Sequence, residues 1–315
     1  MALRDIVVIG TSAGGVHALQ TLVRRLPADL PAALFVVLHT SPGGESLLSG
    51  ILSHAGALPA AMAQEGYAIE SGRIYVAPND RHMLVESGRV RVVFGPRENL
   101  FRPAIDPLFQ SAARAYGRRV IGILLSGTLD DGCNGLAEIK DRGGLAVVQE
   151  PSDAEFPQLP LNAIRRVKVD RVLPAAGIAA LLKVEVTKPI AEEEISVASD
   201  QPGRHFDGVT CPDCQGPIYE NHAGGLRFRC VVGHSYSPEA MRTAHAKKLE
   251  NALWSAIANF DEHATILRRL ARNTTGDRAP DSAGELEGEA RRQEEYASEL
   301  RAFLEKINRT ATAFQ

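Results

Sequence analysis

Short runs of hydrophobic residues alternate with helix-like segments over the first 180 or so residues of the chain. Runs that lack polar alternation are typical of strands buried on both faces of a sheet. We expect strands at Ile6–Ile9, Leu34–Leu38, Ile74–Ala77, Val90–Phe94, Val120–Leu125, Ala146–Gln149 and Arg171–Leu173. We expect helices at Gly15–Arg25, Glu45–His54, Ala104–Tyr116, Cys133–Arg142 and Gly177–Leu182. This alternation predicts an α/β fold with a doubly wound, mostly parallel sheet.

One segment of this region has a different pattern. Residues Gly72–Phe94 carry several β-rich runs separated by turn residues, and we interpret them as a small antiparallel β insertion. After residue 183 the chain becomes polar and acidic. We therefore expect a catalytic-type domain over 1–183, a linker over 184–209, a Cys/His unit over 210–238 and a helical region over 239–315.

The last region shows hydrophobic residues at helical spacing in two stretches. The first stripe consists of Leu249, Leu253, Ile257, Phe260, Ala264, Leu267 and Leu270, and the second lies between Glu285 and Asn308. The segment NTTGDRAPDSAG separates them. Two such stripes predict an antiparallel helical hairpin, in which the stripes bury each other or a partner helix.

Composition limits the class of protein. Hydrophobic residues make up 44% of the 315 residues, which is enough for a sizeable core, and the net charge of −3 argues against a nucleic-acid-coating surface. The chain has no hydrophobic run of about 20 residues and no signal-peptide pattern at its start. We expect a cytoplasmic protein that binds no nucleic acid and does not insert into a membrane.

The first expected strand leads directly into the segment GTSAGG, residues 10–15. The spelling G-x-S-x-G is that of a nucleophile elbow, where glycines at 10, 14 and 15 allow Ser12 to project from a tight strand-to-helix turn. The helix that follows would point free N–H groups at a developing oxyanion. A phosphate-binding turn or a merely tight turn are the alternatives, although the segment lacks the Lys-Ser/Thr of a P-loop and the spacing of a dinucleotide fingerprint.

Two more expected strands end in polar residues. His39 follows the second strand, and Asp130 and Asp131 follow the strand that begins at Val120. Side chains at the C-terminal ends of parallel strands collect in one crevice. Ser12, His39 and an aspartate could thus form an acyl-transfer triad, in which histidine accepts the serine proton and aspartate orients the imidazole.

With these motifs, residues 4–183 or so resemble the catalytic domain of the chemotaxis-type protein-glutamate methylesterases, the CheB type. The resemblance lies in GTSAGG, VVLHTSPGG, IYVAPNDRHMLV, LFRPAIDPLF, LLSGTLDDGCNGL and EFPQLPLNAI, in this order. It implies Ser12 as nucleophile, His39 as base and Asp131, rather than Asp130, as the orienting carboxylate. It also implies hydrolysis of glutamate methyl esters on chemoreceptor-like proteins, with glutamine deamidation in some members.

The chain departs from the family pattern at three positions of the site. Thr128 and Leu129 stand where a methionine and a glycine are usual, and Ala13 stands where a threonine is often found. We also expect no receiver domain ahead of the first strand, and hence no control by a phosphorylated aspartate in the same chain.

The segments CPDC and CVVGH supply a Cys-x-x-Cys pair and a Cys-x-x-x-His pair, Cys211, Cys214, Cys230 and His234. Four such ligands suit tetrahedral zinc with no open position, so we expect a structural zinc ion and no organic cofactor. His222 is an alternative ligand. A redox function of the Cys-x-x-Cys pair is the other alternative, but the sequence around it does not open a helix.

These observations favour a serine hydrolase of the protein-glutamate methylesterase type. A signalling adaptor that has lost activity and binds partners through the Cys/His unit and the hairpin is the alternative, and a hydrolase for some other ester is a third reading. In each of these readings, we expect the hairpin to bind a partner protein or a second copy of the chain.

Overall fold

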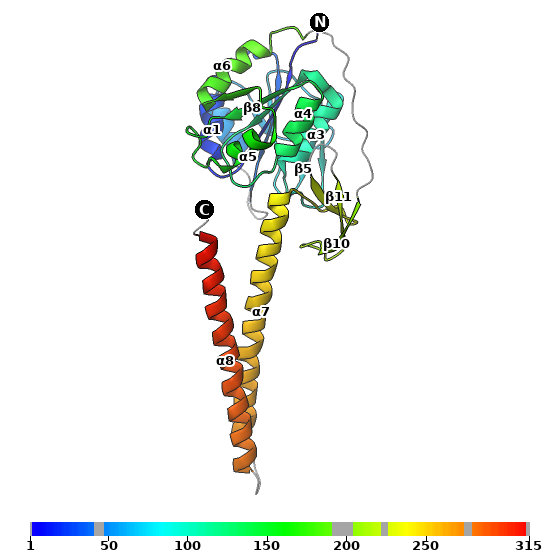
Figure 1. The fold of residues 1–315 in the computed structure, drawn as a ribbon. Coiled ribbons are helices and arrows are strands. Elements are labelled where there is room, and N and C mark those ends of the chain that lie inside the picture. The colour runs from blue at the N-terminus through cyan, green and yellow to red at the C-terminus, as the bar shows by residue number, and fades with distance from the viewer. Residues whose placement is uncertain (1, 41–46, 191–203, 222–225, 274–278, 313–315) are drawn as a thin grey trace. The chain divides into compact units, whose positions relative to one another are not determined.

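The computed structural model describes residues 2–40, 47–190, 204–221, 226–273 and 279–312 (Figure 1). The chain divides into two compact units, Met1–Met241 and Arg242–Gln315. The first unit contains the α/β region and the Cys/His unit, and the second contains most of two long helices.

A seven-stranded sheet forms the centre of the first unit, with the order β3-β4-β2-β1-β7-β8-β9. All of its strand pairs are parallel, which confirms the expected mostly parallel α/β fold. The strands are β1 (Ile6–Thr11), β2 (Ala33–Leu38), β3 (Ala60–Met62), β4 (Ile74–Val76), β7 (Val120–Leu124), β8 (Leu145–Gln149) and β9 (Arg171–Leu173).

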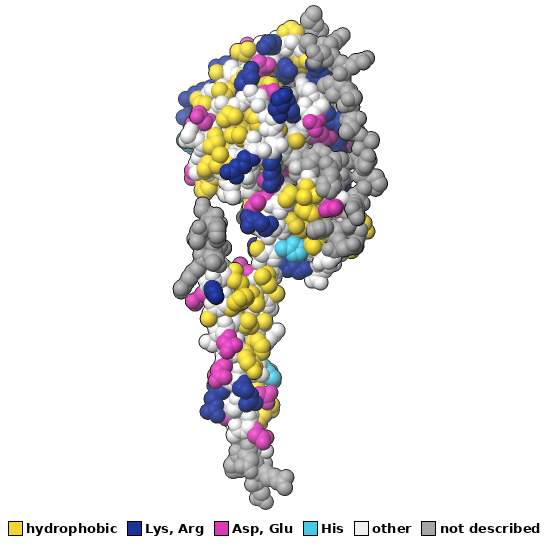
Figure 2. Space-filling model, in the orientation of Figure 1, with side chains coloured by type: hydrophobic (Ala, Val, Ile, Leu, Met, Phe, Trp, Pro, Cys, Tyr) yellow, Lys and Arg dark blue, Asp and Glu magenta, His cyan; other side chains and the backbone are white. Residues whose placement is uncertain are grey.

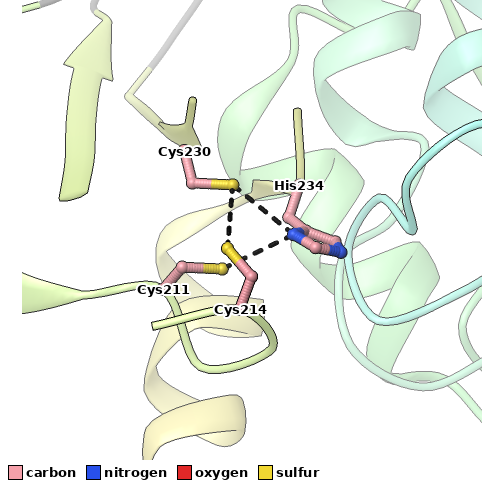
Figure 3. A group of neighbouring side chains, drawn as sticks. All are labelled: Cys211, Cys214, Cys230 and His234. Atoms are coloured by element: carbon pink, nitrogen blue, oxygen red, sulfur yellow. Dashed lines mark hydrogen bonds between the residues drawn. The ribbon is translucent and has the colours of Figure 1, made fainter. Parts of the chain in front are cut away.

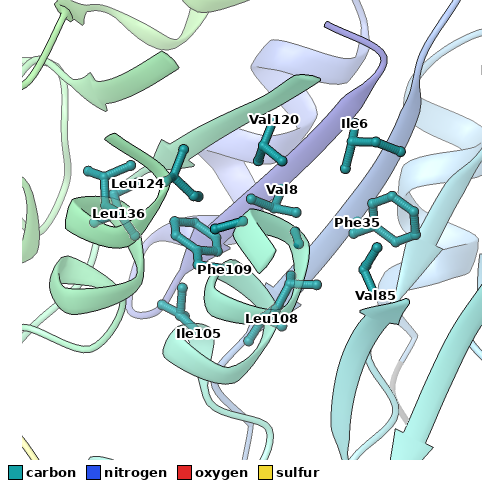
Figure 4. Close-up of a cluster of buried hydrophobic side chains, with 14 of the residues drawn as sticks. Ile6, Val8, Phe35, Val85, Ile105, Leu108, Phe109, Val120, Leu124 and Leu136 are labelled. Atoms are coloured by element: carbon teal, nitrogen blue, oxygen red, sulfur yellow. The ribbon is translucent and has the colours of Figure 1, made fainter. Parts of the chain in front are cut away.

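Helices cover both faces of this sheet, and each face has its own hydrophobic core. In β1, Ile6 and Val8 point into one core whereas Val7 and Ile9 point into the other, as the alternation of side chains along a strand requires. The first core includes side chains of α3, α4 and α5 (Figure 4), and the second includes side chains of α1, α2 and α6. The helices are α1 (Gly15–Val23), α2 (Leu48–Ala55), α3 (Ile105–Tyr116), α4 (Cys133–Asp141), α5 (Gln158–Arg166) and α6 (Ala175–Glu185), with a short 3-10 turn at Gly117–Arg119.

The antiparallel insertion is smaller than the sequence pattern suggested. Strand β4, at the start of the expected insertion Gly72–Phe94, pairs in parallel with β2 and β3 and so belongs to the main sheet. Only β5 (His82–Glu86) and β6 (Arg89–Val93) form an antiparallel pair. Strand β4 and the β5–β6 pair have similarly β-rich sequences. They differ in the strands with which they pair.

The Cys/His unit is a four-stranded antiparallel sheet in the order β10-β11-β12-β13. Its strands are β10 (Arg204–Thr210), β11 (Pro217–Asn221), β12 (Arg227–Cys230) and β13 (Ser235–Tyr236). Residues 191–203 of the expected linker and His222, the alternative metal ligand, lie outside the described residues, as do residues 45–46 at the start of the helix expected to precede β3.

Two long helices, α7 (Pro238–Asn273) and α8 (Ala279–Thr312), pack against each other along their hydrophobic stripes. Ile257 packs with Ala297 and Leu304, and Ala264 packs with Ala290, so the helices are antiparallel. Figure 2 shows further hydrophobic side chains on the visible face of this hairpin. None of the helices in the described part of the chain has the length and hydrophobicity needed to cross a membrane.

Candidate active site

Three neighbouring strands of the main sheet bring Ser12, His39 and Asp131 together. Ser12 follows β1, His39 follows β2, and Asp131 lies in the loop after β7, and these strands are adjacent in the order β2-β1-β7. The His39 Nδ1 atom lies 3.1 Å from Ser12 Oγ, and His39 Nε2 lies 2.7 Å from Asp131 Oδ2. The structure therefore joins all three predicted residues in one hydrogen-bonded chain, although 92 residues separate His39 from Asp131.

The turn that carries Ser12 depends on glycine. Gly14 has a φ of +71°, and a Cβ atom there would lie 2.7 Å from Ser126 Oγ. At Gly15 a Cβ atom would lie 2.2 Å from Thr11 Oγ1. The turn is closed by a hydrogen bond from Gly15 N to Ser12 O of 3.0 Å, and helix α1 starts at this residue. Larger residues at these two positions would force the serine away from the strand end.

The imidazole of His39 is held between a hydroxyl, a carboxylate and an aromatic ring. Its side chain is 4% exposed, and the ring of Phe101 stacks on it with centroids 3.5 Å apart and an angle of 7° between the planes. The two nitrogen atoms of the ring face different partners, since Nδ1 faces Ser12 and Nε2 faces Asp131. The ring has little room to rotate away from either partner.

Asp131 is a buried carboxylate with many donors. Besides His39, Oδ2 accepts a hydrogen bond from Ile105 N at 2.6 Å, and Oδ1 accepts one from Asn99 Nδ2 at 2.7 Å. Burial alone would raise the pKa of Asp131, but the hydrogen bond and charge of His39 and the other donors outweigh it and lower the pKa below its ordinary value. Asp131 is therefore an anion at neutral pH, as the orienting group of a triad must be.

The neighbouring Asp130 has different partners. Its carboxylate accepts a hydrogen bond from Ser237 Oγ at 2.6 Å and forms an ion pair with Arg166. Burial raises the pKa of Asp130, although both partners oppose this effect. The structure thus places Asp131, and not Asp130, against His39.

Sequence reasoning did not identify two residues that contact the predicted triad, Asn99 and Phe101. They belong to a tight turn closed by hydrogen bonds between the backbones of Glu98 and Phe101, from Phe101 N to Glu98 O at 2.9 Å and from Glu98 N to Phe101 O at 3.2 Å. Asn99 and Leu100 have positive φ values, 50° and 77°. Local patterns do not reveal this role, since the contacts of the turn with Asp131 and His39 span more than 30 positions of the chain.

The unusual residue Leu129 has a left-handed backbone. Its φ of 62° explains why a glycine would suit this position. Helix α5 holds the loop in place, because Gln158 Oε1 accepts a hydrogen bond from Leu129 N at 3.1 Å and Asn162 Nδ2 donates one to Leu129 O at 2.8 Å. These two hydrogen bonds anchor the backbone of Leu129 in its left-handed conformation.

The second candidate site is the cluster of Cys211, Cys214, Cys230 and His234 (Figure 3). All four ligand atoms lie within 4.8 Å of one another, with Cys214 Sγ 3.6 Å from Cys230 Sγ and His234 Nδ1 3.4 Å from Cys230 Sγ. Ligands of a tetrahedral zinc ion with Zn–S bonds of about 2.3 Å lie roughly 3.5–3.8 Å apart. The donor set therefore suits a zinc ion, which would draw the more widely spaced ligand atoms, up to 4.8 Å apart, closer together.

Comparisons with known proteins concern the α/β region. A family model described as CheB methylesterase matches residues 7–182, which leaves the Cys/His unit and the hairpin outside the match. A protein-glutamate methylesterase/protein-glutamine glutaminase 2 of Anaeromyxobacter dehalogenans is 40% identical over 184 residues, which cover 58% of this chain and 54% of that protein. The chain thus spans about half the length of this relative.

A shorter relative and a solved structure are covered almost completely. A protein of Leptospira interrogans, to which the same two activities are assigned provisionally, is 38% identical over 178 residues, which make up 92% of its length. The crystal structure of the CheB methylesterase catalytic domain of Thermotoga maritima matches with a TM-score of 0.55 and 31% identity, over 57% of this chain and 97% of that chain.

Proposed function

This chain belongs to the CheB methylesterase family, and from this membership we propose that it hydrolyses glutamate methyl esters on chemoreceptor-like signalling proteins with Ser12, His39 and Asp131. The observation that carries the proposal is the unbroken hydrogen-bonded chain from the Ser12 hydroxyl through His39 to Asp131. Relatives are named for the same reaction, and also for deamidation of glutamine.

The direction of the two imidazole nitrogens determines the tautomer that the reaction needs. Nε2 faces the anionic Asp131 and carries the proton, so Nδ1 is left with a lone pair that accepts the Ser12 proton. The Ser12 oxygen then forms a bond to the ester carbonyl carbon, and Asp131 stabilises the imidazolium. Nδ1 returns the proton to the leaving methoxide, which departs as methanol. A water molecule repeats the sequence on the acyl-enzyme and releases glutamate, and with glutamine as the substrate ammonia leaves instead.

The N-terminus of α1 supplies the proposed oxyanion site. The first N–H groups of a helix have no acceptor within that helix and carry partial positive charge. Helix α1 begins at Gly15, three residues after Ser12. The backbone N–H of Ser12 itself is engaged, because it donates to Ser126 O at 3.0 Å. The Gly15 N–H is engaged as well, since it donates to Ser12 O at 3.0 Å, so we assign the oxyanion role to other N–H groups that follow Ser12.

The Cys/His cluster is proposed to hold a structural zinc ion. Three thiolates and one imidazole fill the four positions of a tetrahedral ion and leave no place for a substrate or water. The triad chemistry itself requires neither a metal nor an organic cofactor. Zinc would stabilise a four-stranded unit that is too small to fold on its hydrophobic core alone.

A second candidate function, a non-enzymatic adaptor, is favoured by the surface of the hairpin. Several large hydrophobic side chains are half-exposed there, among them Leu249, Trp254, Ile266 and Phe303. In our proposal this surface serves self-association. Light scattering of the purified protein tests this, because a dimeric or larger mass supports self-association, whereas a monomeric mass favours binding to another helical protein. Association through the hairpin does not itself exclude catalysis. Whether Ser12 reacts as a nucleophile therefore decides between an enzyme and a non-enzymatic adaptor.

The decisive experiment measures methanol release from a carboxymethylated receptor and labelling of the protein by a fluorophosphonate. Ser12→Ala should abolish both and leave the unfolding midpoint nearly unchanged, because Ser12 is a half-buried turn residue and the exchange removes only its hydroxyl oxygen. Ser53→Ala is the matched control, since Ser53 is exposed on α2 and its hydroxyl exchanges hydrogen bonds with the backbone of Ala60, outside the Ser12–His39–Asp131 chain. Undiminished methanol release by Ser12→Ala would refute the proposal, and absence of labelling in the unaltered protein would favour the adaptor.

A further inference from the structure

The Cys/His unit is joined to the turn Glu98–Phe101 by strand-like hydrogen bonds. Ser235 O accepts a hydrogen bond from Asn99 N at 2.8 Å, and Ser235 N donates one to Arg97 O at 3.4 Å. Ser235 is the residue directly after His234, one of the four metal-ligand candidates. The position of this turn is therefore tied to the loop that carries a ligand.

The side chain of Asn99 continues this connection into the active site. Its Oδ1 accepts a hydrogen bond from Ser237 N at 2.7 Å, while its Nδ2 donates to Asp131 Oδ1 at 2.7 Å and to Asp106 Oδ2 at 3.0 Å. An N–H group can only donate and an ionised carboxylate can only accept, so this environment admits one orientation of the amide. Asn99 is buried, with 3% of its surface exposed.

Two further contacts bind the same parts together. Ser237 Oγ donates to Asp130 and also accepts a hydrogen bond from Ala240 N at 3.1 Å, so Ser237 caps helix α7 and at the same time holds the aspartate loop. Arg227, in strand β12, lies 3.4 Å from Asp106 Oδ2. On the other side of the turn, Phe101 stacks on His39.

From these contacts we infer that Asn99 is a positioning residue for the His39–Asp131 pair and that the metal-binding Cys/His unit holds it in place. This inference rests on the proposed function. Because Asn99 and Leu100 occupy the left-handed region, the turn needs external support to keep its conformation. Binding of zinc to the cluster thereby aligns a catalytic site on another sheet. The activity of this chain then depends on metal, although the metal touches no substrate.

The inference is tested on the full chain with Asn99→Ala and with the unaltered protein after zinc removal by a chelator. We expect each to lower kcat for ester hydrolysis and the rate of fluorophosphonate labelling by about 10- to 100-fold with little change in KM, as for a misaligned catalytic group. Chelation of Asn99→Ala should cause little additional loss, because both changes remove the same support. Asn251→Ala, at an exposed position of α7, is the matched control.

A second readout follows the alignment without activity. The proton on His39 Nε2, in its hydrogen bond to Asp131, should give a low-field NMR signal, which is assigned by its loss in Asp131→Asn. We expect the signal to weaken or shift in Asn99→Ala and on chelation. The circular dichroism spectrum of the full chain should keep its helical features, because the α/β region stays folded. Asn99→Asp offers a second variant of the same shape, and it should be at least as impaired because it places a third carboxylate beside Asp106 and Asp131.

Three results would overturn the inference: a normal rate and signal in Asn99→Ala with its zinc retained, a normal rate and signal after zinc removal, or equal losses on chelation with and without Asn99. Failure of the proposed function is recognised separately. If Ser12→Ala still released methanol while the low-field signal still responded to Asn99 and zinc, the assignment of Ser12 as the nucleophile would fail and the positioning role would stand.

Discussion

The active site and the Cys/His cluster are held together in two different ways. Ser12, His39 and Asp131 come from three strand ends, and the two hydrophobic cores on either side of the sheet support them. The four residues of the cluster lie within the short segment from Cys211 to His234, with Cys230 at the end of strand β12 and the other three in turns between short strands that have few buried hydrophobic residues. Packing supports the geometry of the first site, whereas the second would depend on the proposed zinc ion. The turn Glu98–Phe101 contacts both sites, and by our inference it links the alignment of the first to the second.

The largest expected effect comes from the carboxylate that orients His39. Asp131→Asn keeps the shape of the side chain but presents an N–H or a neutral oxygen to His39 Nε2, which favours the wrong imidazole tautomer. We expect kcat to fall by about 10³- to 10⁴-fold. Steady-state methanol release measures this, with Asp130→Asn as the comparison because Asp130 does not contact His39. Equal losses in the two variants would contradict the assignment of Asp131.

Removal of the metal should affect the two regions unequally. Structural zinc contributes about 10 kcal/mol to the folding of units of this kind. Chelation, or Cys214→Ser, should therefore expose the segment between Cys211 and His234 to proteases while the α/β region remains folded. Limited proteolysis followed by mass spectrometry locates the cleavage. Resistance of the segment after complete zinc removal would show that its hydrogen bonds suffice.

The acidic residues around the turn predict a pH effect on stability. Burial raises the pKa of Glu98 from 4.5 to about 7, with Arg227 opposing the shift. The folded protein then binds this proton more tightly than the unfolded chain does, so the stabilisation is complete below about pH 4.5 and is lost as the pH rises towards 7. Between pH 4.5 and about 7, the free energy of unfolding should therefore fall less for Glu98→Gln than for the unaltered protein. Urea unfolding across this range tests the difference, and parallel curves would exclude the shift.

The smallest expected effect concerns the loop before Asp131. Leu129→Gly should raise the free energy of unfolding by about 0.5 kcal/mol, because the relief of a left-handed leucine exceeds the entropy that glycine adds to the unfolded chain. Val184→Gly, at an exposed position of helix α6, should have the opposite sign. Urea unfolding compares the two, and destabilisation by Leu129→Gly would mean that side-chain packing of Leu129 matters more than its backbone.

Local patterns predicted much of the fold and the residues of the site. Unbroken hydrophobic runs identified most strands of the main sheet, since a strand covered on both faces has no polar face. The glycines around Ser12 and the polar residues at two strand ends indicated where the chemistry would lie. The pattern failed for β4, which was assigned to the antiparallel insertion, and it missed helix α5, whose residues Gln158 and Asn162 hold the loop of Leu129.

The sequence by itself determined the residues able to do chemistry: a serine on a glycine turn, a histidine and an aspartate after hydrophobic runs, and three cysteines with a histidine at ligand spacing. These follow from backbone sterics and side-chain chemistry, which are local properties. The residues after strand β7 did not separate Asp131 from Asp130, and only the family resemblance favoured Asp131; the tertiary structure places Asp131 against His39 and shows that Asn99 links Asp131 to Ser237. Those choices depend on contacts between residues more than 30 positions apart, which packing of the whole unit selects and no short pattern encodes.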